Sequence, residues 1–64
     1  MKHTEHEYIT AGYKYERATT PNLGQAAAEA LRMMLDSEAL PNRPDARRLI
    51  EQGRQEARLS AART

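Results

Sequence analysis

Two histidines near the N-terminus, His3 and His6, are the residues whose type and spacing come closest to a metal site. A third-position histidine and a free amino terminus together can surround Cu(II) or Ni(II) with nitrogen ligands in a square plane, a geometry that these ions prefer. His6 could add a ligand if the segment is helical, because helix neighbours lie three or four residues apart. Both histidines belong to a polar terminal stretch, and such stretches are usually poorly ordered. We therefore predict a solvated end, with no metal site and no cofactor.

Side chains that could perform covalent or acid–base catalysis are scarce. The chain has no cysteine, which also excludes disulfides and thiolate zinc sites, and neither Ser37 nor Ser60 lies in a nucleophile-elbow context. The glycines are isolated, so there is no glycine-rich phosphate loop. A chain of 64 residues can hardly enclose a catalytic site of roughly a few hundred Å³. We predict that the protein is not an enzyme.

Arginines of the C-terminal third form a line along one flank of a predicted helix: Arg43, Arg47, Arg54 and Arg58. Such a line could contact nucleic-acid phosphates. Glu51 lies within the line and could pair with Arg47 and with Arg54 or Arg58. We expect a solvated face laced with ion pairs; a nucleic-acid footprint or an acidic protein partner are the alternatives.

All three tyrosines, Tyr8, Tyr13 and Tyr15, fall within eight residues. Tyrosine rings can fill a core while their hydroxyls stay hydrated, and tyrosine also concentrates at interface hot spots. Because the chain has little other bulk, we predict that at least two of them belong to the core. Tyr13 is predicted to be exposed and, with Met33 and Leu35, to contact a partner.

Two proline-containing breaks, residues 19–22 and 40–45, divide the chain into three segments. The middle segment, 21–38, is rich in strong helix formers and begins with Thr20 as a candidate N-cap before Pro21. Its apolar residues recur at helical spacing and form one stripe. The members of this stripe are Leu23, Ala26, Ala27, Ala30, Leu31 and Met34.

The third segment, 44–61, also has a helical pattern, with Asn42 and Asp45 as a cap-like pair. Its inward stripe is bulky at Leu49 and Ile50 and small afterwards. Gly53 in mid-helix costs about 1 kcal/mol relative to alanine. The close approach of another helix backbone would explain a glycine there; a tolerated glycine without a role is the alternative.

The first segment fits two patterns. As a strand, Ile9, Ala11, Tyr13 and Tyr15 would alternate with polar residues, whereas as a helix the apolar residues would gather on one face. Thr4 and Glu7 have the spacing of a capping box, and a lone strand could pair only with another molecule. We therefore predict a helix over residues 4–18.

The strand alternative would make the chain similar to the ribbon-helix-helix repressors, dimers whose outward strand residues read the major groove. That resemblance would give Thr10 and Lys14 the role of base readers. About six residues separate the strand pattern from the next helix, whereas that family joins the two almost directly. The turn at residues 40–45 also departs from the family's compact, glycine-containing one. We assign the chain to no family.

These observations predict one small all-α domain, residues 1–64, of three helices at about 4–18, 21–38 and 44–61, the last two forming an antiparallel hairpin. The apolar inventory is thin, with no Phe and no Trp, so we expect a homo-oligomer or a partner that completes the core. No apolar run approaches the ~20 residues that span a bilayer, and the polar start has no signal-peptide pattern; we expect a cytoplasmic location and no membrane partner.

The predicted function is that of a non-catalytic regulatory or inhibitory module that docks on a larger protein. Small proteins of this kind are often encoded by phages and plasmids. The competing hypothesis is a nucleic-acid-binding transcriptional regulator of the strand-helix-helix type.

Overall fold

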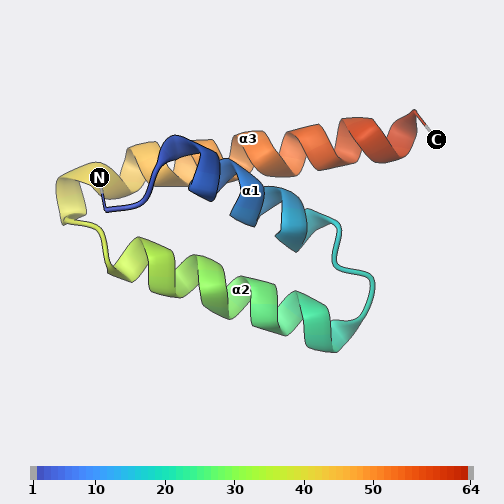
Figure 1. The fold of residues 1–64 in the computed structure, drawn as a ribbon, viewed down its shortest axis with the longest axis horizontal. Coiled ribbons are helices and arrows are strands. Elements are labelled where there is room, and N and C mark those ends of the chain that lie inside the picture. The colour runs from blue at the N-terminus through green and yellow to red at the C-terminus, as the bar shows by residue number, and fades with distance from the viewer. Residues whose placement is uncertain (1, 64) are drawn as a thin grey trace.

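The computed structural model describes residues 2–63, and three helices account for most of them. They are α1 (Glu5–Glu16), α2 (Pro21–Asp36) and α3 (Arg43–Ala62), and a short 3-10 helix, η1 (Leu40–Asn42), leads into α3 (Figure 1). No strand occurs among these residues, so the predicted all-α class is confirmed, with each helix boundary within two residues of the prediction. The strand alternative for residues 8–15 is wrong, because they lie within α1.

Two of the predicted helix starts are capped as expected. The Thr4 hydroxyl accepts a hydrogen bond from the Glu7 backbone N–H at 3.1 Å, and the Thr20 hydroxyl accepts one from the Leu23 N–H at 3.2 Å. Each bond satisfies a donor that the first helical turn leaves unpaired. The pair predicted for the third helix start, Asn42 and Asp45, does not form a cap. The Asn42 side chain makes no capping hydrogen bond, because Asn42 belongs to η1 and its backbone is already helical where α3 begins.

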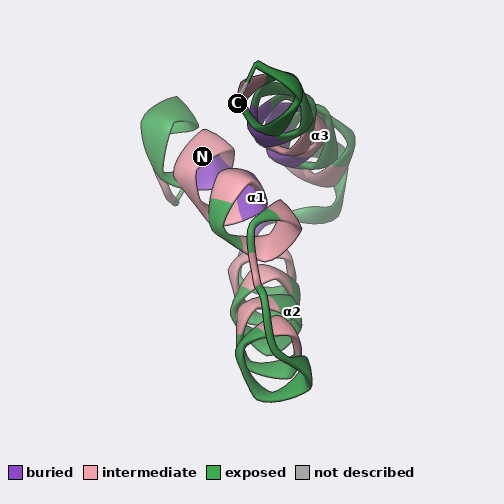
Figure 2. Ribbon diagram, turned by 90° about the vertical axis from the view of Figure 1, so that its right-hand side faces the viewer, coloured by how far each residue is buried: buried purple, intermediate pink, exposed green. Residues whose placement is uncertain are grey.

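Helix α1 lies between the other two helices (Figure 2). It packs along α3 and, on another face, against α2. Helices α2 and α3 are joined by a short turn and run in opposite directions (Figure 1), but they touch each other only sparingly. The antiparallel pair is therefore held together mainly through α1.

The contact between α1 and α3 depends on two facing glycines. A methyl group on Gly12 would overlap the carbonyl group of Ile50, and one on Gly53 would overlap the carbonyl group of Ile9. Both glycines are buried, so the two backbones meet at this crossing. The close approach predicted for Gly53 is confirmed, and α1 is the helix that approaches.

The core is small and centres on the α1–α3 contact. Its fully buried members are Tyr8 and Ala46, with Leu49 and Ile50 nearly so. Four half-buried side chains pack against it: Ile9, Leu31, Met34 and Leu35. No residue of α2 is itself buried. Within residues 2–63, no helix has the length and apolar character needed to cross a membrane.

Candidate docking surface

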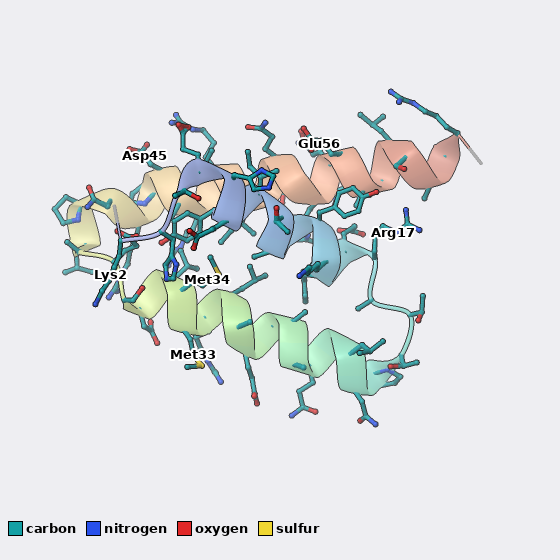
Figure 3. The ribbon with its side chains drawn as sticks, viewed as in Figure 1. Lys2, Arg17, Met33, Met34, Asp45 and Glu56 are labelled. Carbon is teal, nitrogen blue, oxygen red and sulfur yellow. The ribbon has the colours of Figure 1, made fainter. Side chains whose placement is uncertain are left out.

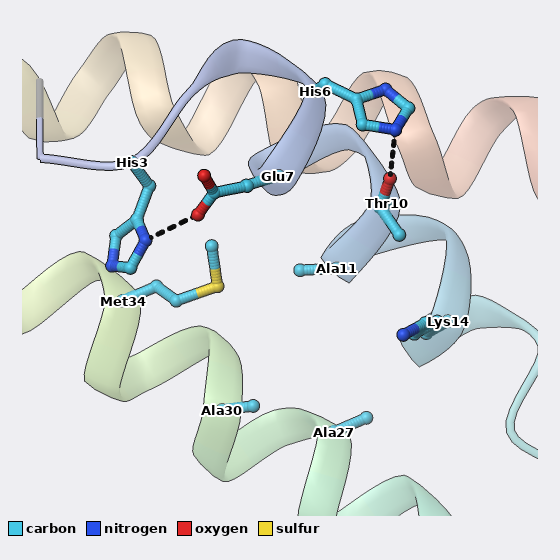
Figure 4. A pocket seen from close by; sticks show the side chains of 9 residues that line it. All are labelled: His3, His6, Glu7, Thr10, Ala11, Lys14, Ala27, Ala30 and Met34. Atoms are coloured by element: carbon cyan, nitrogen blue, oxygen red, sulfur yellow. Dashed lines mark hydrogen bonds and ion pairs between the residues drawn. The ribbon is translucent and has the colours of Figure 1, made fainter.

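A shallow hollow of about 430 Å³ lies between α1 and α2 (Figure 4). From α1 it is lined by Glu7, Thr10, Ala11 and Lys14, which share one face because they recur at three- and four-residue spacing. From α2 it is lined by Ala27, Ala30 and Met34, and the lining is completed by His6 of α1 and by His3, which precedes α1. The alanines leave the hollow open, since their side chains fill little of the space between the helices.

A second hollow continues the first toward the C-terminal end of α1. Lys14 and Ala27 line both hollows, and Arg17 and Leu23 are found in the second. Together the two hollows form one groove along α1 and α2, which we call the α1–α2 groove. It runs from Met34 and His3 at one end to Leu23 and Arg17 at the other.

Apolar side chains of α2 remain exposed in and beside this groove. Leu23 is 57% exposed, and Ala30 is also exposed. Met34 points from α2 toward α1, whereas Met33 points away from it and is 71% exposed (Figure 3). The apolar stripe predicted for α2 is therefore only partly covered by the rest of the chain.

The charges along the groove are unevenly satisfied. The Glu7 carboxylate is 2.8 Å from Nδ1 of His3 and accepts a bond from the Thr4 hydroxyl. The hydrogen bond with His3 and the bond to Thr4 lower the pKa of Glu7 below its ordinary value. By contrast, Lys14 forms no ion pair with any residue in the described part of the chain, and the Arg17 guanidinium group donates a hydrogen bond there only to the Tyr13 hydroxyl, at 3.3 Å.

One end of the groove is fixed by a buried carboxylate. Glu38 is 4% exposed, and its Oε2 accepts hydrogen bonds from the Tyr8 hydroxyl at 2.6 Å, the Lys2 N–H at 2.6 Å and the His3 N–H at 3.2 Å. The hydrogen bond from Tyr8 is the main cause that lowers the pKa of Glu38. The pKa of Tyr8 is raised, mainly because its hydroxyl is buried and also because it donates to Glu38. The bonds from the Lys2 and His3 N–H groups hold this segment against Glu38, just past the end of α2. The His3 ring lies at the groove, edge-on to the Tyr8 ring, with the two ring centroids 5.6 Å apart.

The apolar candidates from the sequence are separated by the fold. Met33 is exposed on the outer side of α2, while Leu35 is half-buried and packs against the core. Tyr13 is half-buried rather than exposed as predicted. Hydrogen bonding to Ser60 of α3 and to Arg17 lowers the pKa of its hydroxyl. It nevertheless lines the second hollow of the groove. Of the other tyrosines, Tyr8 is buried and Tyr15 half-buried.

Three of the four arginines in the predicted line are engaged within the chain. Arg54 and Arg58 both pair with Glu16 of α1, at 3.0 and 3.1 Å, and with Glu51. Hydrogen bonding to Glu51 is the main cause that raises the pKa of Arg58. Arg54 also lies over the Tyr15 ring, 5.1 Å from its centroid.

The remaining two arginines differ from each other. Arg43 donates to the backbone carbonyls of Glu38, at 3.2 Å, and Asp36, at 3.4 Å, and so caps the end of α2. Arg47 is exposed and has no ion pair among residues 2–63. Glu51 thus pairs with Arg54 and Arg58 and not with Arg47. The line does not present four free guanidinium groups to a phosphate backbone.

The terminal histidines are occupied by neighbours. Nδ1 of His3 faces Glu7, and Nε2 of His6 is 3.4 Å from the Thr10 hydroxyl. Within residues 2–63 no three His, Cys, Asp or Glu side chains gather as metal ligands would. The amino terminus that the copper or nickel alternative requires belongs to Met1, outside the described residues.

Sequence reasoning missed the groove itself and the carboxylate that fixes its end. The alanines of α2 could have predicted the groove, because a stripe of small side chains on the apolar face of a helix leaves space beside a neighbouring helix. Glu38 gave no signal, because nothing in its local sequence predicts that it faces Tyr8, 30 residues away.

Comparisons with known proteins identify no relative. No protein-family model matches the chain, and neither the curated proteins nor the solved structures contain a match.

Proposed function

We propose that this protein is a non-catalytic regulatory or inhibitory module that docks on a larger protein through the α1–α2 groove. The observation that supports the proposal is the incomplete cover of α2. This 16-residue helix has no buried residue, and Leu23 leaves more than half of its side chain in contact with water. Burying a leucine-sized side chain is worth about 1.5–3 kcal/mol, so a protein that covered this face would gain stability from it.

The ionic arrangement of α3 favours this function over nucleic-acid binding. Arg54 and Arg58 already serve Glu16 and Glu51, and Arg43 serves backbone carbonyls. A phosphate backbone would have to displace those partners before it gained anything from these side chains. A protein partner is therefore favoured over a nucleic acid.

The test compares two charge insertions on the same helix. Ala30→Glu places a carboxylate in the groove, while Ala28→Glu places one on an exposed part of α2 outside the groove lining. Glutamate is a good helix former, so both variants should keep α2. Tagged wild type and both variants are used to capture proteins from a lysate of the native host, with and without nuclease.

We expect one protein to be captured by the wild type and by Ala28→Glu, with nuclease present, and to be lost with Ala30→Glu. Equal capture by both variants would contradict the proposal, as would capture that disappears with nuclease. Homo-oligomerisation remains a prediction; sedimentation of the wild type over a wide concentration range tests it, and a constant monomer mass would contradict it.

A further inference from the structure

We propose that the part of the partner that fills the α1–α2 groove is an acidic amphipathic helix. This inference rests on the docking function proposed above and adds the chemistry of the occupant. Three features of the groove support it: its length and shape, the small residues that line it, and the sign of its unpaired charges.

The shape suits a helix. The groove follows two neighbouring helices from Met34 to Leu23, which are 11 residues apart on α2. At about 1.5 Å per residue this distance is about 16 Å, or three turns of an incoming helix. A third helix laid along α1 and α2 would place its i, i+3 and i+4 side chains into such a groove, as amphipathic helices do in other helix-binding proteins.

The lining suits apolar side chains of larger size than its own. Ala11, Ala27 and Ala30 form the middle of the groove, and small residues permit a close approach of another helix (Figure 4). Met34 closes one end, and its flexible thioether can adapt to different neighbours. Leucine or phenylalanine side chains of the partner would fill the space that the alanines leave.

The charges select an acidic partner. Lys14 has no ion pair among residues 2–63, and Arg17 is held only by the Tyr13 hydroxyl and ring. The acidic residue of the groove lining, Glu7, is already engaged by His3 and Thr4. Carboxylates that flank the apolar stripe of the incoming helix would therefore meet two cations that have no ion pair among residues 2–63, and the Glu7 carboxylate lies in the first hollow, beside His3, rather than beside Arg17. Charge complementarity of this kind governs partner choice more than raw affinity.

The experiment uses two synthetic peptides of about 18 residues, long enough to form about 27 Å of helix. Both carry leucines at i, i+3, i+4 and i+7 spacing; one has glutamates beside them and the other has lysines at the same positions. Each peptide is titrated into the isotope-labelled protein, and backbone amide shifts report where it binds. We expect the acidic peptide to shift the amides of Ala27, Ala30 and Met34 and to bind about tenfold more tightly than the basic one.

Charge reversal provides the matched comparison. Lys14→Glu should remove or invert the preference for the acidic peptide, and Arg32→Glu, an equal change of net charge on α2 outside the lining, should leave it unchanged. High salt should weaken the preference, because the pairs are exposed. Equal affinity for the two peptides, binding away from the groove, or no binding at millimolar concentration would overturn the inference. Groove amides that shift with protein concentration alone would also overturn it, since they would show a second copy as the occupant.

The experiments distinguish failure of the acidic-helix inference from failure of the docking proposal. A captured protein that depends on Ala30 but is not displaced by the acidic peptide would refute the acidic helix and leave the docking proposal standing. A captured protein that ignores Ala30→Glu would refute the docking proposal itself.

Discussion

The replacement of Gly53 by alanine sets helix propensity against tertiary packing. In an isolated helix the change is favourable by about 0.8–1.0 kcal/mol. In the folded protein the new methyl group would overlap the Ile9 carbonyl and come within 2.9 Å of the Tyr13 backbone nitrogen. These obstacles are backbone atoms of α1, so no side-chain rotation can relieve them. We expect Gly53→Ala to destabilise the protein.

The size of the effect follows from the two opposing terms. Overpacking of a well-filled interior costs about 1–3 kcal/mol and occasionally more. Because a whole helix must move here, the cost should lie at the upper end, and the propensity gain offsets only about one third of it. A net loss of about 2 kcal/mol remains, which corresponds to a fall in melting temperature of about 8–16 °C for a domain of this size.

Urea and thermal unfolding followed by far-UV circular dichroism would measure this loss. Gly24→Ala is the matched control, because a methyl group there would meet only the Ala18 Cβ, at 3.9 Å. That control should be neutral or stabilising by up to about 1 kcal/mol. A peptide of residues 43–62 should become more helical with alanine at position 53, which would separate propensity from packing. If Gly53→Ala melts at or above the wild-type temperature in the full chain, the close crossing of α1 and α3 is refuted.

Three further predictions concern the buried carboxylate and the ion pairs. Tyr8→Phe should lower the free energy of unfolding by about 1.5–3 kcal/mol in urea titrations at neutral pH, because it removes a hydrogen bond to a charged group; an unchanged midpoint would contradict the geometry. The pKa of Glu38 is lower in the folded protein than in the unfolded chain, so this carboxylate stabilises the fold above the unfolded pKa, and that stabilisation is lost as the pH falls through the folded pKa. Glu38→Gln should therefore flatten the loss of stability below about pH 4.5, measured as melting temperature against pH. An unchanged acid slope would count against this role of Glu38. Arg54→Gln should lower the free energy of unfolding by less than about 1 kcal/mol, and by less still in high salt, because the pair of Arg54 with Glu16 is partly exposed. Arg47→Gln should leave the free energy of unfolding unchanged. Equal losses for the two variants in urea unfolding would contradict this difference.

The sequence by itself determined the local elements of this protein. Helix formers, Thr4 and Thr20 as caps, and the proline breaks are signals that act over a few residues, so they placed three helices to within two residues at each end. The glycine in mid-helix also carried information, because a residue that costs helix stability needs a tertiary reason. That signal predicted a close helix contact at Gly53 without naming its partner.

Tertiary structure decided which surfaces the helices share. Local patterns give the apolar face of a helix but not the neighbour that covers it, so α1 as the central helix, with α2 and α3 on either side, followed only from packing. The same limit applies to long-range polar contacts: Arg54 and Arg58 meet Glu16 about 40 residues away, and Glu38 meets Tyr8 across 30. The α1–α2 groove arises in the same way, because its lining comes from two helices that only tertiary packing brings side by side.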